Sequence, residues 1–309
     1  MNSQKRNTYL LMIVLVFSWG LEYIFAKHIL AIMNSLTLIF FKYMIGVAVA
    51  LIVKWKIDGK GLMRREDIPM FLICAIVGEV GYYYLEYTSM SYLPVSLVTI
   101  ILAFVPALSI LIDKAVFKKS ITKKMIIGVL LSTVGIAMVI GIDYRLLFQG
   151  RIFGYLMAFA AVIAWNAYNF LTASLHDRYR TATLTANQII CTCLMVFPYA
   201  LHHLPDRGSL TVSIVVQILY LGIISTGIGF MIQVRALHVL GPTATAMFSN
   251  FLPITTTFFG WLILKETILP FQMAGGALVI AAGYIVIKEK GRLEELSDGA
   301  TTDEHDPAD

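Results

Sequence analysis

The feature that most limits the possible folds of this chain is an internal sequence repeat. Residues 93–140 align with residues 240–287 without a gap when the chain is shifted by 147 positions. Helix breakers and small residues coincide in this alignment, where Pro106 falls on Pro253 and Gly128 on Gly275. A shift of 146 places Trp19 on Trp165 in the opening segments of the two halves. Ungapped register of this kind is typical of an internal duplication, so we expect one structural unit written twice.

The solvent for most of this chain is expected to be lipid. Hydrophobic residues make up 58% of the 309 residues and charged residues 14%, against about 25% charged residues in soluble domains. The apolar residues form long runs, and ten membrane-spanning helices of about 20 residues each account for nearly the whole chain. The net charge of +5 lies mainly at helix ends, so it does not indicate nucleic-acid binding. The sequence predicts an all-α integral membrane protein.

The apolar runs predict five transmembrane helices in each repeat. In the first repeat, residues 1–147, we expect them at 9–30, 36–53, 69–92, 94–116 and 125–142. In the second repeat, residues 148–290, we expect them at 152–175, 184–202, 212–237, 243–264 and 271–287. Residues 291–309 are acidic and have little to bury, which predicts a disordered cytoplasmic tail.

The distribution of basic residues predicts the orientation of these helices. With the N-terminus in the cytoplasm, 17 Lys and Arg residues fall on the inner side and 4 on the outer side. Basic loops favour the cytoplasm, so both termini are expected there. Because each repeat has an odd number of helices, the second repeat enters the membrane from the opposite face. Inverted repeats of this kind are a recurrent plan of secondary transporters.

Several short motifs lie within or at the ends of the expected helices. They are Ser18-Trp19-Gly20, Ala164-Trp165, Ala236-Leu237, Lys265-Glu266-Thr267 and Gly275-Gly276-Ala277-Leu278. With the mid-helix prolines, they resemble the ten-helix EamA-type members of the drug/metabolite transporter superfamily over about residues 8–290. Lys118-Lys119-Ser120 and Lys42 depart from that family's usual pattern, in which an acidic residue and an arginine are commoner. The resemblance implies export of amino acids, related metabolites or toxic compounds.

Six ionisable residues are expected at bilayer depth, where each costs roughly 2.5–3.5 kcal/mol on insertion scales. They are Glu22, Lys27, Lys42, Glu79, Glu86 and Arg235. Lys27 and Arg235 lie near helix ends, and we interpret them as interfacial anchors. The other four are candidates for a polar cavity, because intramembrane charge is rare without a function.

A substrate site is predicted on the first three helices. Glu22 follows Trp19 by one helical turn, on the same face. A regular helix returns Glu79 and Glu86 to nearly one face, with Tyr83 between them. Lys42 either forms an ion pair with Glu22 or Glu79, or binds a substrate carboxylate, and both interpretations stay open. The full predicted substrate-binding set is Trp19, Glu22, Lys42, Glu79, Tyr83, Glu86, Trp165 and Asn169.

Glu79 and Glu22 are the candidate proton-coupling groups. Burial disfavours the charged form of a carboxyl, whereas a nearby cation or substrate ammonium favours it, so substrate occupancy can change protonation. No phosphate-binding loop ending in Lys-Ser/Thr is present, which argues against ATP as the energy source. We find no metal or nucleophile motif, so neither an enzyme nor a bound cofactor is expected.

These features predict a secondary active transporter that exports amino acids or related small metabolites across the cytoplasmic membrane by alternating access. The alternative is a multidrug or organic-cation effluxer that uses an intramembrane glutamate. Lys42, a positive charge in the same cavity, argues against that alternative. The expected partners are a small-molecule substrate and the lipid bilayer, and a homodimer is left open.

Overall fold

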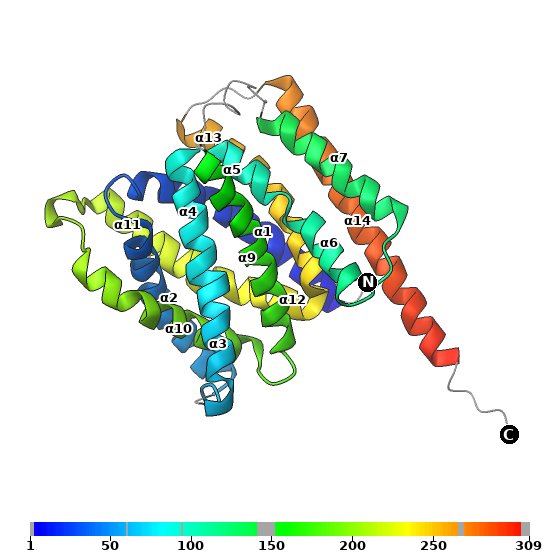
Figure 1. Ribbon diagram of the computed structural model, residues 1–309, viewed down its shortest axis with the longest axis horizontal. Helices are drawn as coiled ribbons and strands as arrows, with labels where there is room; N and C mark the ends of the chain where they lie inside the picture. The colour runs from blue at the N-terminus through cyan, green and yellow to red at the C-terminus, as the bar shows by residue number, and fades with distance from the viewer. Residues whose placement is uncertain (1–2, 60, 94, 141–151, 265–268, 304–309) are drawn as a thin grey trace.

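The computed structural model describes residues 3–59, 61–93, 95–140, 152–264 and 269–303. In this part of the chain the regular elements are all helices (Figure 1). The predicted all-α fold is thereby confirmed. The expected junction between the repeats, at 147/148, and the Lys265-Glu266-Thr267 motif lie outside the described residues.

The first repeat begins with α1 (Ser3–Ile29) and α2 (Ser35–Ile57). Asn34 caps α2, because its side chain accepts a hydrogen bond from the Thr37 backbone N–H at 2.9 Å. A 3-10 turn (Arg65–Asp67) precedes the third rod, which consists of α3 (Ile68–Cys74), the π-helical turn η2 (Ala75–Gly81) and α4 (Tyr82–Tyr92). The remaining helices are α5 (Val95–Leu102), α6 (Val105–Ala115) and α7 (Lys123–Ile140).

The second repeat follows the same plan. It begins with α9 (Ile152–Ser174) and α10 (Thr181–His202). After a 3-10 turn (Arg207–Ser209), its third rod consists of α11 (Val212–Tyr220), the π-helical turn η4 (Leu221–Ile228) and α12 (Gly229–Ala246). The chain continues through the 3-10 turn η5 (Met247–Phe251), α13 (Leu252–Leu264) and α14 (Pro270–Asp303).

Seven helical stretches of the described chain are long and apolar enough to cross a membrane. One of them, Val212–Ile263, holds two rods, because Gly241 breaks the helix with a φ of 77° and a ψ of 167°. Glycine adopts a positive φ without the clash of a Cβ atom, so it suits this turn. The broken helix α5–α6 and the helix α7 lie where the remaining expected helices were predicted.

Both repeats interrupt their helices at equivalent places. The two π-helical turns coincide after a shift of 146 residues, since Ala75 falls on Leu221. Pro106 lies in the first turn of α6, directly after the break between α5 and α6. Its partner Pro253 lies at the start of α13, directly after a 3-10 turn. Proline suits a first turn because its missing N–H has no partner there anyway.

The helices pair across the two repeats. α7 packs along α14 and α2 packs along α10, so equivalent helices contact each other. α4 packs along α9, and the equivalent pair is α1 with η4 and α12. Residues of both repeats consequently share one hydrophobic core. A site between these helices is built from both halves of the chain.

The contact between α7 and α14 depends on glycine. A Cβ atom on Gly135 would lie 2.8 Å from the Gly275 carbonyl oxygen and 2.9 Å from Val279 Cγ2. A Cβ atom on Gly128 would lie 2.5 Å from Val286 Cγ2. Small residues let membrane helices approach closely, and with the shift of 147 Gly128 falls on Gly275 and Gly135 on Ala282.

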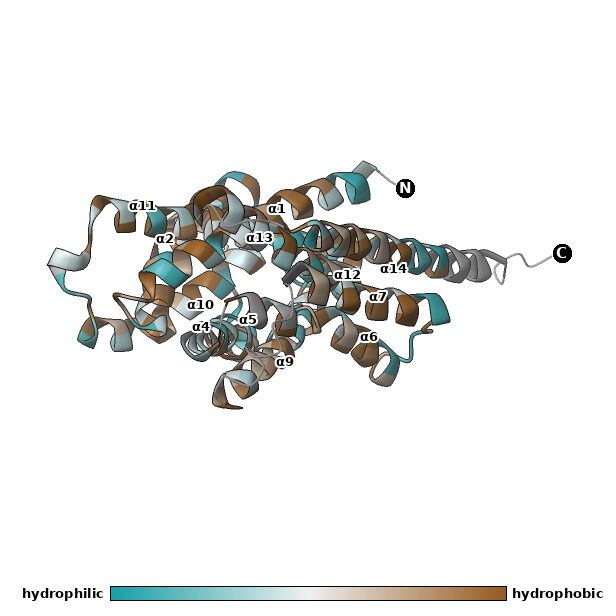
Figure 2. Cartoon of the chain, turned by 90° about the horizontal axis from the view of Figure 1, so that it is seen from above, coloured by the Kyte–Doolittle hydropathy of each residue, from teal (hydrophilic) through white to brown (hydrophobic). Residues whose placement is uncertain are grey.

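Helix ends lie on two sides of the bundle, and the inverted orientation of the repeats stays a prediction. In Figure 1, α14 ends at the lower right, whereas α7 ends and α9 begins at the upper side. Figure 2 shows hydrophobic colour along the helices and hydrophilic colour at the start of α1 and before α7. The tail was expected to be disordered from Gly291, but α14 stays helical to Asp303. No proline interrupts the chain there, so the helix is free to continue.

Gly135→Ala is expected to lower the thermal unfolding midpoint, because overpacking of a close contact costs about 1–3 kcal/mol. Gly291→Ala is the matched control, since Gly291 lies in α14 with open space around it. There the substitution should leave or raise the midpoint, because alanine favours a helix over glycine by about 1 kcal/mol. Thermal unfolding of the detergent-purified protein measures both. A Gly135→Ala midpoint as high as that of Gly291→Ala would contradict the close packing of α7 on α14.

Candidate functional site

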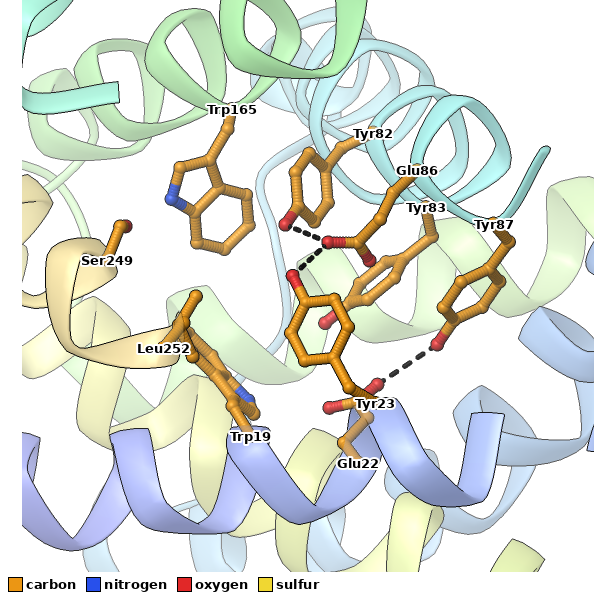
Figure 3. Close-up of a pocket in the computed structure, with 10 residues that line it drawn as sticks. All are labelled: Trp19, Glu22, Tyr23, Tyr82, Tyr83, Glu86, Tyr87, Trp165, Ser249 and Leu252. Atoms are coloured by element: carbon orange, nitrogen blue, oxygen red, sulfur yellow. Dashed lines mark hydrogen bonds between the residues drawn. The ribbon is translucent and has the colours of Figure 1, made fainter. Parts of the chain in front are cut away.

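A small cavity lies at the centre of the bundle, where the two repeats meet (Figure 3). Its volume is about 20 Å³, which is room for about one water molecule. α1 and α4 of the first repeat supply most of the lining, and α9, η5 and α13 supply the rest. The lining residues are Trp19, Glu22, Tyr23, Tyr82, Tyr83, Glu86, Tyr87, Trp165, Ser249 and Leu252.

Glu86 is held by two tyrosine hydroxyls. Tyr23 and Tyr82 each donate a hydrogen bond of 2.5 Å to Glu86 Oε1, as Figure 3 shows. In the described part of the chain no Lys or Arg nitrogen forms an ion pair with Glu86. Burying a carboxylate without a cation is costly. Glu86 is therefore a position at which an added positive charge would be stabilised.

Glu22 is already neutralised by Lys42. The Lys42 Nζ atom lies 2.6 Å from Glu22 Oε1, and both side chains are buried. The Tyr87 hydroxyl lies 3.1 Å from Lys42 Nζ and donates to Glu22 Oε1 at 3.0 Å. The ring of Tyr83 lies over the ammonium, with its centroid 3.4 Å from Nζ, a cation–π contact. The ion pair considered for Lys42 is thus formed, and a contact between Lys42 and substrate stays a prediction.

Glu79 lies in a second polar cluster, outside the lining of the cavity. Thr192 Oγ1 donates to Glu79 Oε2 at 2.5 Å, and the Tyr168 hydroxyl donates to Oε1 at 3.5 Å. These donors belong to α10 and α9, so a carboxyl group of the first repeat is bound by the second. Among the described residues Glu79 also forms no ion pair with Lys or Arg. The hydrogen bonds to Glu79 come from hydroxyl groups.

The π-helical turn explains why Glu79 and Glu86 lie in different clusters. A regular helix would place them on one face, but Glu79 lies within η2, whose wider turn changes its direction relative to α4. Gly78 in the same turn lets the Tyr168 ring approach, since a Cβ atom there would lie 2.1 Å from Tyr168 Cδ2. The single polar stripe expected from the sequence is divided in two.

The charged residues of the first repeat have neutral counterparts in the second. With the shift of 146, the pairs are Glu22 with Tyr168, Lys42 with Gln188, and Glu79 with Ser225. Tyr168 and Gln188 lie together, with 3.3 Å between the hydroxyl and Oε1 of Gln188. The Ser225 carbonyl accepts a hydrogen bond from Trp19 Nε1 at 3.3 Å. At these three paired positions the charge therefore lies in the first repeat only.

Aromatic rings form the remaining wall of the cavity. Trp19 and Trp165, which the repeat alignment pairs, lie with ring centroids 5.8 Å apart and planes at 76°. Tyr82 lies 4.6 Å from Trp165 by the same measure. Phe230 of α12 does not line the cavity, but its ring contacts those of both tryptophans and Tyr83. An aromatic wall beside an uncompensated carboxylate is suited to a cationic group.

Five of the eight predicted site residues line the cavity: Trp19, Glu22, Tyr83, Glu86 and Trp165. Lys42 lies beneath Tyr83, and Glu79 lies in its own cluster. Asn169 accepts from Gln233 Nε2 at 3.0 Å, outside the lining. Of the expected anchors, Lys27 donates to the Met90 carbonyl at 2.8 Å and Arg235 to Thr8 Oγ1 at 3.4 Å.

Sequence reasoning missed Tyr23, Tyr82 and Tyr87, which line the cavity and hold its carboxylates. Of the three consecutive tyrosines at 82–84, Tyr84 is 44% exposed and the other two line the cavity. The donors to Glu79, Thr192 and Tyr168, also went unnoticed, because neither carries a charge. Within the described residues no group of three or more His, Cys, Asp or Glu is arranged to hold a metal ion.

Comparison with known proteins identifies the class to which this chain belongs. The model of the EamA-like transporter family matches twice, over residues 6–141 and 152–288. The chain therefore belongs to the EamA-like transporter family, and it is a multi-pass membrane transporter rather than an enzyme.

Named relatives are distant but cover most of the chain. An uncharacterized transporter of Archaeoglobus fulgidus is 20% identical over 88% of this chain and 95% of its own. A probable amino-acid metabolite efflux pump of Salmonella typhimurium is 21% identical over 92% and 95%. A probable terminal-alkyne amino-acid exporter of Streptantibioticus cattleyicolor is 23% identical over 76% and 78%. One solved crystal structure superposes with a TM-score of 0.73 at 16% identity, covering 91% and 97%, and shows the same fold.

Lys42→Met is expected to lower the thermal unfolding midpoint strongly, because removing one partner of a buried pair costs about 3–5 kcal/mol. Glu22→Gln in the same chain should recover most of that loss, since no unpaired charge is left. Arg64→Gln is the control, because it breaks an exposed pair with Glu66 that is worth about 0–1 kcal/mol. Thermal unfolding in detergent measures all three. A double variant no more stable than Lys42→Met would contradict the ion pair.

Proposed function

We propose that this transporter is a secondary active exporter of small, ammonium-bearing metabolites of the amino-acid class. The observation that carries the proposal is Glu86, a buried carboxylate in an aromatic cavity with no cation paired to it among the described residues. The names of two relatives, an amino-acid exporter and an amino-acid metabolite efflux pump, support the same substrate class.

The chemistry of the cavity favours recognition of the ammonium group. Tyr23 and Tyr82 both donate to Oε1 of Glu86, and no hydrogen bond from the described residues reaches Oε2. A substrate ammonium would donate to Oε2 and lie against the rings of Trp19 and Trp165. Lys42 would meet a substrate carboxylate only after its pair with Glu22 opens, as the cavity widens. Tyr83, which lies over Lys42, would move with that opening.

Alternating access accounts for the closed cavity. With room for about one water molecule, it has to widen before substrate enters. Tyr23 is shared with a cavity of about 670 Å³ that reaches Lys27 and His28, so the Tyr23–Glu86 bond would close the outer route. On the opposite side, Arg178 contacts Asp67 at 2.5 Å across the repeats, which would close the inner route. Opening one closure at a time is the behaviour expected of inverted repeats.

The proposal includes the cytoplasmic membrane as location, with both termini in the cytoplasm. The excess of basic residues on the side of both termini supports this orientation. Substrate and lipid are then the partners, and assembly as a homodimer stays open.

Proton coupling is assigned to Glu79 in preference to Glu22. Glu22 has Lys42 at 2.6 Å, which holds it as an ion pair. Glu79 forms hydrogen bonds with the hydroxyls of Thr192 and Tyr168 and no ion pair among the described residues, so protonation would lower the cost of its burial. Because its donors belong to α9 and α10, rearrangement between the repeats would change the surroundings of Glu79. Its protonation would then follow the transport cycle.

A multidrug or organic-cation effluxer remains the second candidate function. The aromatic wall around Glu86 also suits a bulky cation. The Glu22–Lys42 pair argues against it, because a large hydrophobic cation would lie close to a buried ammonium. The two functions differ in the size and the carboxylate of the substrate they accept.

Transport of a radiolabelled amino acid in proteoliposomes should be inhibited by the unlabelled amino acid and by its decarboxylated amine. The deaminated acid should not inhibit, since recognition depends on the ammonium. Glu86→Gln should reduce transport at least ten-fold in protein that still elutes as a folded species. Inhibition by the deaminated acid alone would contradict the proposal, and transport of tetraphenylphosphonium without amino-acid transport would favour the multidrug alternative.

Glu79→Gln keeps the shape of the side chain and removes its charge. It should abolish efflux driven by a proton gradient, while counterflow exchange of labelled for unlabelled substrate persists, because exchange needs no net proton movement. Flux in proteoliposomes at several external pH values measures both, with Glu22→Gln for comparison. An unchanged pH dependence in Glu79→Gln would exclude Glu79 as the coupling group.

A further inference from the structure

A second large cavity lies away from the central cavity and is lined by residues of α2, α10 and α12, and Figure 1 shows where these helices lie. Its volume is about 640 Å³, within the range of about 300–1,000 Å³ that holds small molecules. Apolar residues form one wall, among them Ile57, Ile228 and Met231. Ile57 is 62% exposed and Ile228 41%. In a chain that spans the membrane, exposed apolar residues face lipid, so this groove opens to the bilayer.

The charged residues of the lining carry one more positive than negative charge, since they are Asp58, Asp177, Arg178, Arg180 and Arg235. The only hydrogen bond of Arg235 in the described part of the chain is a long one, from Nε to Thr8 Oγ1 at 3.4 Å. No carboxylate of those residues pairs with it. By contrast, Arg178 and Arg180 at the rim are engaged by Asp67 and Asp58. Arg235 thus has no ion-pair partner among the described residues, in a groove that is also lined by apolar side chains.

Two histidines lie beside Arg235 in the same groove, with ring centroids 4.7 Å apart. Burial and the neighbouring His238 lower the pKa of His176 to about 4, so its ring is neutral at pH 7. His176 is hydrogen-bonded to the Val234 backbone, and its Nε2 is buried without a partner among the described residues. The bonded nitrogen is therefore Nδ1, which carries the hydrogen and leaves Nε2 as an acceptor. A ligand group that donates a hydrogen bond would satisfy it.

We propose that this groove binds one anionic phospholipid whose headgroup carries a hydroxyl. Arg235 pairs with the phosphodiester, and His176 Nε2 accepts a hydrogen bond from the headgroup hydroxyl. An acyl chain lies along Ile57, Ile228 and Met231. This site is independent of the proposed substrate, because the groove shares no lining residue with the central cavity.

The lining favours a lipid over a soluble anion. A free phosphate would leave the apolar wall uncovered, whereas a phospholipid covers both ends of the groove. One arginine without a carboxylate also matches the single negative charge of a phosphodiester. Basic pockets between transmembrane helices are known places for anionic lipid headgroups.

Native mass spectrometry of the purified full-length chain with added lipids tests the proposal. Dioleoylphosphatidylglycerol should bind once per chain, at least ten-fold more tightly than dioleoylphosphatidylcholine. Arg235→Gln should remove that preference, and His176→Phe should lower affinity for phosphatidylglycerol to that for phosphatidylmethanol, a phosphodiester without a headgroup hydroxyl. Arg64→Gln is the matched control, because Arg64 is exposed and does not line the groove.

Equal affinity for phosphatidylglycerol and phosphatidylcholine would overturn the site. An equal loss of the preference for phosphatidylglycerol in Arg235→Gln and Arg64→Gln would also overturn the site, because it would indicate only an effect of surface charge. Displacement of phosphatidylglycerol by 10 mM inorganic phosphate would show a free-phosphate site instead. If Arg235→Gln does not fold, Ile57→Asp removes the acyl contact, and unchanged lipid retention in that variant would overturn the proposal.

Discussion

The interaction on which the site depends is the ion pair of Glu22 and Lys42. In the membrane interior no water compensates a buried charge, so both residues must be satisfied by protein groups. Lys42 meets this requirement with Glu22, the Tyr87 hydroxyl and the Tyr83 ring, and these contacts join α2 to α1 and α4. The pair also determines which buried carboxylates have no ion-pair partner among the described residues. With Glu22 neutralised, Glu86 and Glu79 remain as carboxylates held only by hydroxyl groups.

The two halves of the chain share the arrangement of their helices, and they differ in the charged residues near the cavity. Both repeats carry a π-helical turn and a tryptophan at the same positions, and the two tryptophans face each other across the cavity. The charged residues Glu22, Lys42 and Glu79 have the neutral counterparts Tyr168, Gln188 and Ser225. In the proposed function, the two repeats would allow two conformations of similar energy, and the asymmetric charge would make them differ in their response to substrate and protons. In this account Glu86 recognises the ammonium, and Glu79 senses the rearrangement.

The sequence predicted the frame of this fold better than its interior. Long apolar runs, the paired prolines and the break at Gly241 follow from local rules that hold in lipid, and the family model matches within both expected repeats. The face to which a side chain points was harder to predict. A π-helical turn leaves no signal in hydrophobic periodicity, so Glu79 and Glu86 were expected on one stripe although they lie in separate clusters. Tyr23 was missed because its hydrogen-bond partner, Glu86 of α4, is distant in the sequence.

The most direct test of the account is whether ligand binding changes the fluorescence of the two tryptophans that line the cavity. The chain has four tryptophans, and Trp55 and Trp261 are exposed, so replacing both with phenylalanine leaves Trp19 and Trp165 as reporters. Titration with amino acids and their decarboxylated amines should change this fluorescence in a saturable way. The change should be lost in the same background with Glu86→Gln, in protein that still elutes as a folded species. A response that persists without the Glu86 charge, or that only deaminated acids produce, would contradict the assignment of this cavity as the ammonium site.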